Sequence, residues 1–150
     1  MNKPEIVYVT YIAATRAAVW DALTQPELTQ RYWFDTRIES DWKVGSPVLY
    51  RREGQITDEH TVLEVQPGQL LRHTFHPVVT EEYRAEPPSR VTFSLEEDGG
   101  VVRLTTVHDE FPPDSAVFLA CSAGWPMVLS GLKTFLETGK SLPKFDFSSR

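Results

Sequence analysis

The chain has 150 residues, of which 41% are hydrophobic and 24% charged, and this composition predicts one globular domain over residues 1–150. Its net charge of −6 gives no general attraction to nucleic-acid phosphates or anionic lipid, so we expect neither nucleic-acid binding nor membrane insertion. Cys121 is the only cysteine, which excludes an internal disulfide, and with no signal-like segment at the start it favours a cytoplasmic location.

The chain begins with a predicted strand followed by two helices. The run EIVYVTYIAA is β-branched and aromatic, as is typical of a strand. From Thr15, a suitable N-cap, apolar residues recur at helical spacing until Pro26 ends the pattern. Because proline is tolerated in a first turn, we expect a second short helix from Pro26 to about Tyr32.

The middle of the chain predicts an antiparallel meander. Turn signals separate five strand-like runs, which are SPVLYRRE, TVLEVQ, QLLRHTFHP, RVTFSLEE and VVRLTTVHDEF. Asp98-Gly99-Gly100 tolerates positive φ between two alternating runs and predicts a tight hairpin. The stretch VTEEYRAEPPS is expected to be a longer, mobile loop.

A long helix is predicted from about Asp114 to Thr138, with Asp114 or Ser115 as its N-cap and Gly139 as its C-cap. We expect a bend or a restart at Pro126, and a tail over residues 140–150. One apolar stripe follows the helix through Phe118, Cys121, Trp125, Leu129, Leu132 and Leu136. The concave face of a curled sheet is the one place where such a stripe can be buried.

The order strand, two short helices, meander and long C-terminal helix resembles the helix-grip arrangement of the START and Bet v 1-like (SRPBCC) superfamily, an α+β fold. The segments SDWKVGSPV, VQPGQLLRHTFHP and GWPMVLSGLKTFLETG are similar to bacterial proteins related to the C-terminal domain of the Hsp90 ATPase activator. The resemblance covers nearly the whole chain and implies a cavity between the sheet and the long helix. It does not by itself imply one function, because a fold hosts many.

Three functions from different classes stay open for this cavity. The favoured one is binding of a small hydrophobic or aromatic molecule, and the second is a cyclase- or hydrolase-like reaction in the same cavity. The third is a protein-interaction module like the co-chaperone, although the chain has no room for the activator's additional N-terminal domain, which puts stimulation of Hsp90 in doubt. Formation of a homodimer is left open.

Alternation along two strand-like runs predicts that two histidines point into this cavity. His73 shares a strand face with Leu71 and Phe75, and His108 shares one with Leu104, so both imidazoles should face the helix. Two convergent polar groups of this kind can orient a ligand. The alternative is that each imidazole only satisfies a local hydrogen bond, as most buried polar groups do.

The predicted ligand-binding set combines these histidines with apolar and aromatic neighbours: Trp33, Tyr50, His73, Phe75, His108, Cys121, Trp125 and Leu129. Cys121 has no positive neighbour in sequence and is expected to be an inert packing residue. We expect no cofactor and no metal, because no phosphate-binding or nucleophile motif occurs and His73 and His76 fall on opposite strand faces. No catalytic residue is predicted.

Overall fold

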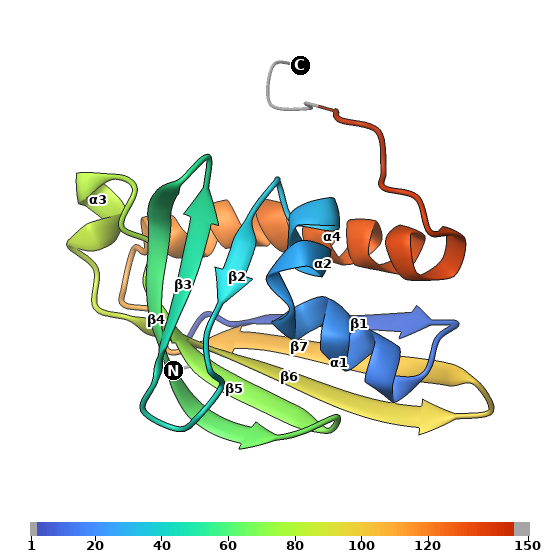
Figure 1. Ribbon diagram of the computed structural model, residues 1–150. Helices are drawn as coiled ribbons and strands as arrows, with labels where there is room; N and C mark the ends of the chain where they lie inside the picture. Colours follow the sequence, from blue (N-terminus) through green and yellow to red (C-terminus); the bar gives the residue numbers. More distant parts are fainter. Residues whose placement is uncertain (1–2, 146–150) are drawn as a thin grey trace.

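The computed structural model describes residues 3–145, and within this range an antiparallel sheet of seven strands packs against helices (Figure 1). The elements in chain order are β1 (Ile6–Ile12), α1 (Arg16–Thr24), α2 (Pro26–Tyr32), β2 (Arg37–Glu39), β3 (Pro47–Arg52), β4 (Gln55–Gln66), β5 (Leu70–Phe75), α3 (Glu81–Arg84), β6 (Ser89–Asp98), β7 (Val101–Asp109) and α4 (Ala116–Thr138).

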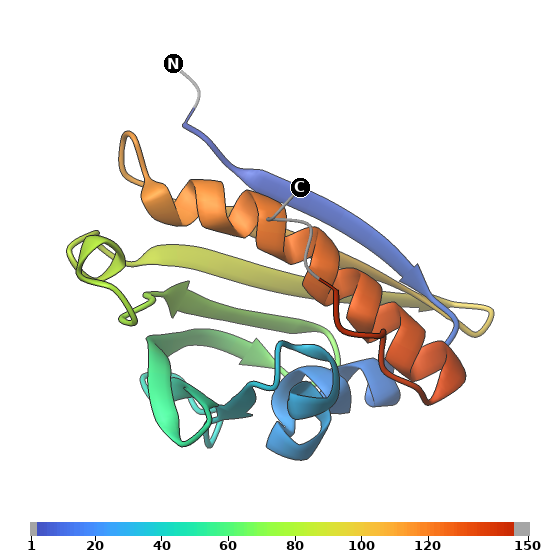
Figure 2. The same cartoon turned by 90° about the horizontal axis from the view of Figure 1, so that it is seen from above.

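The strands are ordered β1-β7-β6-β5-β4-β3-β2 in the sheet, and every neighbouring pair is antiparallel. The sheet curls, and α4 lies across its concave side (Figure 2). This confirms the predicted helix-grip architecture. The β6–β7 hairpin is also as predicted, because Asp98 pairs with Val101 across Gly99 and Gly100, whose φ angles are 60° and 83°.

The helix ends follow from local side-chain chemistry. The Thr15 hydroxyl accepts a hydrogen bond from the Ala18 amide at 3.1 Å, and α2 begins at Pro26 as expected. Ser115, rather than Asp114, caps α4 by accepting from the Phe118 amide at 2.9 Å. Gly139 ends the helix in the left-handed conformation with φ 76°.

The helix α4 continues through Pro126 without a restart. Three local expectations need correction. The stretch VTEEYRAEPPS contains the short helix α3, which Thr80 caps through the Tyr83 amide. The short strand β2 was not expected, and β4 begins at Gln55 instead of Thr61.

The core lies between α4 and the sheet. On the predicted stripe of α4, Trp125, Leu129 and Leu132 are buried, whereas Phe118, Cys121 and Leu136 are partly buried. With 23 residues, α4 is also long and apolar enough to span a membrane by length and composition, but its apolar stripe packs against the sheet here. Of the predicted tail, residues 140–145 are described and 146–150 lie outside the described residues.

Candidate functional site

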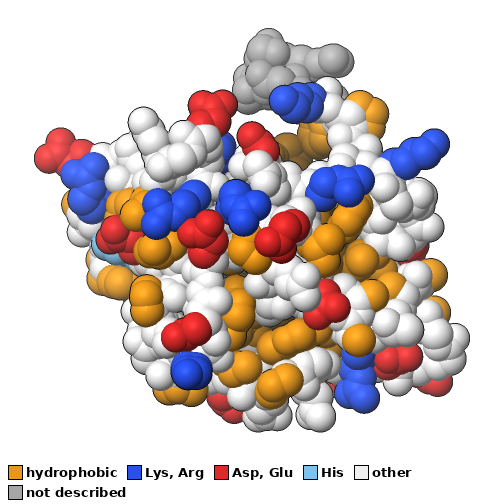
Figure 3. Space-filling view, viewed as in Figure 1, with side chains coloured by type: hydrophobic (Ala, Val, Ile, Leu, Met, Phe, Trp, Pro, Cys, Tyr) orange, Lys and Arg blue, Asp and Glu red, His pale blue; other side chains and the backbone are white. Residues whose placement is uncertain are grey.

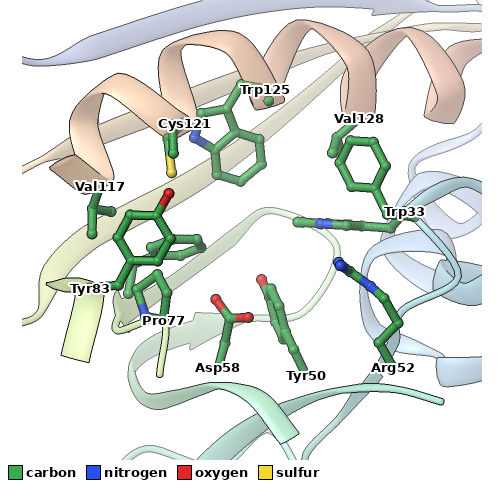
Figure 4. A pocket seen from close by; sticks show the side chains of 14 residues that line it. Trp33, Tyr50, Arg52, Asp58, Pro77, Tyr83, Val117, Cys121, Trp125 and Val128 are labelled. Atoms are coloured by element: carbon green, nitrogen blue, oxygen red, sulfur yellow. The ribbon is translucent and has the colours of Figure 1, made fainter. Parts of the chain in front are cut away.

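A cavity of about 160 Å³ lies between α4 and the curled end of the sheet (Figure 4). One wall comes from α4, and the others come from β3, β4, β5, α3 and the segment after α2. Its lining residues are Trp33, Phe34, Tyr50, Arg52, Asp58, Phe75, Pro77, Tyr83, Val117, Ala120, Cys121, Gly124, Trp125 and Val128. Apolar and aromatic side chains therefore form most of the wall, with few polar groups among them.

Aromatic rings in mutual contact form the inner end of the cavity. The ring centroid of Trp33 lies 5.6 Å from that of Tyr50 and 5.6 Å from that of Trp125, and both pairs are edge-to-face. Phe75 lies 6.3 Å from both Tyr50 and Trp125. Such contacts stabilise aromatic pairs beyond the area they bury, so this wall is preformed.

Asp58 places a carboxyl group in this apolar cavity. It pairs directly with Tyr50 across β3 and β4, and the Tyr50 hydroxyl and Asp58 carboxyl point into the cavity together in Figure 4. The residue is only 9% exposed, and its Oδ1 accepts a hydrogen bond from the Thr57 hydroxyl at 2.7 Å. Burial raises the pKa of Asp58 to about 6, against the lowering effects of Thr57 and Arg52.

His60 lies next to Asp58 on the same face of β4. Its Nδ1 accepts from the His76 amide at 2.9 Å, so the neutral ring carries its proton on Nε2. That Nε2 is buried without a hydrogen-bond partner and lies 3.7 Å from Asp58 Oδ2, beyond hydrogen-bond distance. Burial, together with His73 and His108 nearby, lowers the pKa of His60 well below its usual range.

His108 connects the cavity wall to the sheet through a satisfied chain of hydrogen bonds. The Trp125 Nε1–H donates to His108 Nδ1 at 3.0 Å. Nδ1 is therefore the acceptor, and the Nε2–H donates to Ser89 Oγ at 2.7 Å. Burial lowers the pKa of His108 to about 3, so the imidazole stays neutral and fixes the orientation of the Trp125 ring.

His73 is also a neutral, buried imidazole. Its Nδ1–H donates to the Thr74 carbonyl at 2.6 Å, and its ring stacks on His60 with centroids 5.0 Å apart. Burial lowers its pKa to about 4. The histidines at 60, 73 and 108 thus form a layer behind the cavity wall, with Phe75 in contact with His60 and His108 at 4.7 Å.

The mouth of the cavity is more polar and more exposed than its inner end. Phe34 is 47% exposed, and the exposed Arg52 donates to the Thr36 hydroxyl at 3.1 Å. On the far side, α3 carries Tyr83, and Glu86 accepts from the Ala116 amide at 2.7 Å at the start of α4. Lys, Arg, Asp and Glu side chains are interspersed over the face shown in Figure 3.

Five of the eight predicted ligand-binding residues line the cavity: Trp33, Tyr50, Phe75, Cys121 and Trp125. His73, His108 and Leu129 are buried toward the helix as alternation predicts, but they lie behind the wall. Both histidines form ring hydrogen bonds with other groups of the protein, so their imidazoles are not the polar groups that face the cavity. A binding role for the eight residues stays a prediction.

Sequence reasoning missed Asp58, Arg52 and Tyr83, which all line the cavity. Asp58 had a usable signal, because Asp58, His60 and Val62 alternate with exposed residues along β4. The predicted strand TVLEVQ starts at Thr61 and therefore does not include Asp58 and His60. Tyr83 lies on the short helix that was expected to be a loop.

Cys121 points into the cavity from α4 in Figure 4. Burial raises the pKa of its thiol to about 12, with Asp58 and Glu86 adding to the effect. The thiol is therefore a poor nucleophile at neutral pH. Among residues 3–145, no group of three or more His, Cys, Asp or Glu side chains could hold a metal ion.

Comparison with known proteins places this geometry in a family. The profile of the family described as Activator of Hsp90 ATPase homolog 1-like protein matches residues 13–137. No curated protein sequence matches. Solved structures of about the same length share the fold, and their sequence identities with this chain are below 25%.

Three of these structures show the range of the fold. Protein MLL2253 from Mesorhizobium loti has a TM-score of 0.76 at 23% identity, over 89% of this chain and 97% of that one. The Aha1 dimer from Colwellia psychrerythraea has a TM-score of 0.74 at 21% sequence identity, and the match covers 92% of this chain and 99% of that one. An HSP90 activator from Plasmodium falciparum has a TM-score of 0.74 at 16% sequence identity, and the match covers 89% of this chain and 96% of that one.

Proposed function

Because the chain belongs to the Activator of Hsp90 ATPase homolog 1-like family and has an apolar cavity between α4 and the sheet, we propose that this cavity binds a small hydrophobic molecule. The observation that carries the proposal is the cavity of about 160 Å³, bounded by Trp33, Tyr50, Phe75 and Trp125. An apolar cavity of roughly 150 Å³ suffices for one benzene-sized ring. We therefore expect a ligand that inserts one aromatic ring or a short apolar chain.

Benzyl alcohol tests this proposal, because it is neutral and about the size of the cavity. Two of the four tryptophans, Trp33 and Trp125, line the cavity, so ligand entry should change the intrinsic fluorescence. The substitution Cys121→Phe would fill the cavity from α4 and should abolish binding. Its matched control is Ser122→Phe, on the exposed face of the same turn, which should leave binding unchanged. Equal binding by both variants would contradict a site in this cavity.

Native mass spectrometry of the protein purified from its own host tests the same proposal without a chosen probe. A retained small molecule supports ligand binding, whereas a retained protein supports the interaction module that the family description suggests. The dimer among the similar structures makes a second copy of the chain one of the masses to look for. A cytoplasmic location and one domain over residues 1–150 are part of this proposal, the former because Cys121 is a free thiol.

An enzyme acting in the same cavity is the second candidate, and the observation that favours it is Asp58. A carboxyl group with a pKa of about 6 can both take and give a proton near neutral pH. The Tyr50 hydroxyl beside it could bind an oxygen of the substrate. If the protein converts a retained ligand on incubation and Asp58→Asn does not, the result supports an enzyme rather than simple binding.

A further inference from the structure

The carboxyl group of Asp58 is buried in the cavity with only one of its oxygens bonded. Oδ1 accepts from the Thr57 hydroxyl at 2.7 Å. Within residues 3–145, no donor reaches Oδ2 at hydrogen-bond distance, and His60 Nε2 is 3.7 Å away. The Asp58 side chain is 12% exposed, so Oδ2 is accessible and can accept a hydrogen bond from a donor on a ligand in the cavity.

Among the described residues, the positive groups near Asp58 compensate its charge only in part, because Arg52 lowers the pKa of this carboxyl less than burial raises it. Arg52, the one cationic residue in the lining, is exposed at the mouth and bonds the Thr36 hydroxyl. Figure 4 shows the Tyr50 ring between Asp58 and Arg52. Since solvent screens an exposed guanidinium, the inner end of the cavity is negative whenever Asp58 is ionised.

The rest of the wall also suits a cation. Six aromatic side chains line the cavity, and an aromatic ring attracts a positive charge placed over its face. These are Trp33, Phe34, Tyr50, Phe75, Tyr83 and Trp125. A carboxylate surrounded by such rings combines the two groups that proteins use to hold an ammonium ion.

We propose that the cavity binds a small protonated amine carried on an aromatic or other apolar body, with the ammonium group bonded to Asp58 Oδ2. The inference rests on the proposed function and adds the chemical class of the ligand. A neutral alcohol would fill the same space and donate one hydrogen bond, but it would leave the carboxylate charge uncompensated. An anion would be repelled by that charge.

The amine should bind less well as the pH falls below about 6, where Asp58 becomes protonated. Bound ammonium favours the ionised carboxylate, so binding should in turn lower the pKa of Asp58. The charged and titratable groups packed around this carboxyl come from its own strand, from β3, from the segment after β5 and from α4, and they are His60, Tyr50, Arg52, His76 and Cys121. The histidine at 60 and the thiol are held neutral by burial.

Three probes of nearly equal size separate charge from shape: benzylamine, benzyl alcohol and benzoate. Near neutral pH, the full chain should bind benzylamine at least about tenfold more tightly than benzyl alcohol, and benzoate most weakly. In Asp58→Asn, the affinity for benzylamine should fall about tenfold or more, while the affinity for benzyl alcohol should change little. Tryptophan fluorescence and calorimetry provide the affinities.

Glu59→Gln is the matched control, because Glu59 is the next carboxylate on β4 and is exposed on the opposite face. It removes the same charge from the chain and should alter none of the three affinities. Continued binding of benzyl alcohol by Asp58→Asn shows that the cavity survives the substitution. Equal affinity of the chain for benzylamine and benzyl alcohol overturns the inference and leaves the proposed function standing. Failure of all three probes to bind overturns both.

Discussion

At the scale of single residues, the cavity depends on polar groups that are either fully or only partly hydrogen-bonded. His108 belongs to the first kind, with Trp125 and Ser89 on its two nitrogens. Asp58 belongs to the second, with one oxygen open to the cavity. The first arrangement fixes a wall, and the second leaves a position that a ligand can occupy.

Trp125 should contribute to stability through both its ring and its Nε1–H. Trp125→Ala removes the ring and leaves His108 Nδ1 buried and unpaired, and a large-to-small aromatic substitution in a core typically destabilises by about 3–5 kcal/mol. Because one side of Trp125 borders the cavity, we expect the lower part of that range. Trp125→Phe keeps most of the ring and should lose about 1–2 kcal/mol from the hydrogen bond.

Chemical denaturation of both variants measures these losses. A loss for Trp125→Ala at the upper end of the range would mean that the ring is fully packed and the cavity does not reach it. No loss for Trp125→Phe would show that the bond to His108 has no net effect on stability.

Asp58→Asn should stabilise the protein without ligand. Burial raises the pKa of Asp58 from 3.8 to about 6, so its favourable contribution is present below 3.8 and is lost as the pH rises through about 6. Above that pH the buried carboxylate destabilises the fold by up to about 3 kcal/mol, because each pKa unit corresponds to about 1.4 kcal/mol. Asparagine removes the charge and keeps the acceptor for Thr57.

Urea unfolding of this variant near pH 7.5 and again near pH 4 measures the effect, which should be a gain of about 1–3 kcal/mol at the higher pH and little at the lower. A lower stability of Asp58→Asn at the higher pH would mean that the carboxylate has a stabilising partner. It would also contradict the assignment of Oδ2 as open to a ligand.

At the scale of elements, two glycines on α4 have opposite surroundings. A Cβ added at Gly131 would lie 3.0 Å from the Tyr32 carbonyl oxygen of α2, whereas one added at Gly124 meets nothing within 4 Å. Glycine in a helix interior is less stable than alanine by roughly 0.5–1 kcal/mol. Gly124→Ala should therefore stabilise by about that amount, and Gly131→Ala should destabilise by pushing α4 away from α2.

Thermal and urea unfolding of the two variants test this contact. The sign of the difference is the informative result, because both substitutions change helix propensity equally. If Gly131→Ala is as stable as Gly124→Ala, then α2 and α4 do not approach as closely as the structure shows.

At the scale of the whole molecule, buried neutral histidines make the fold sensitive to acid. The pKa of His73 is lowered from 6.5 to about 4 and that of His108 to about 3, so their contribution is present above about 6.5 and is lost as the pH falls toward those values. Near pH 4.5 each should reduce stability by about 2 kcal/mol. Asp58 opposes this in part, because its protonation stabilises the fold over the same range.

The change in unfolding free energy between about pH 7 and pH 4.5 measures this sensitivity, and His73→Phe isolates one contributor. The phenyl ring can keep the stacking on His60, but it cannot titrate. Whatever its stability at neutral pH, the variant should lose about 2 kcal/mol less on acidification than the parent chain. An equal loss in both proteins would show that His73 does not link folding to pH.

The sequence alone determined most of the element order and the face of each long element. Alternation along β5 and β7 correctly predicted that His73 and His108 are buried. The helix ends at Thr15, Pro26 and Gly139 were also predicted correctly. Both kinds of signal depend on backbone geometry within a few residues. The start of β4 was not predicted, because Asp58 and His60 are polar residues on the inward face and a hydrophobic pattern does not detect them.

Only the tertiary structure decided which inward side chains line the cavity. Facing inward places a residue in the core, but whether it borders empty space depends on what packs in front of it. His108 is covered because Trp125 of α4 donates to it, whereas Asp58 stays open because no donor from any other described element reaches its Oδ2. These contacts join residues far apart in the chain, and no local pattern records them.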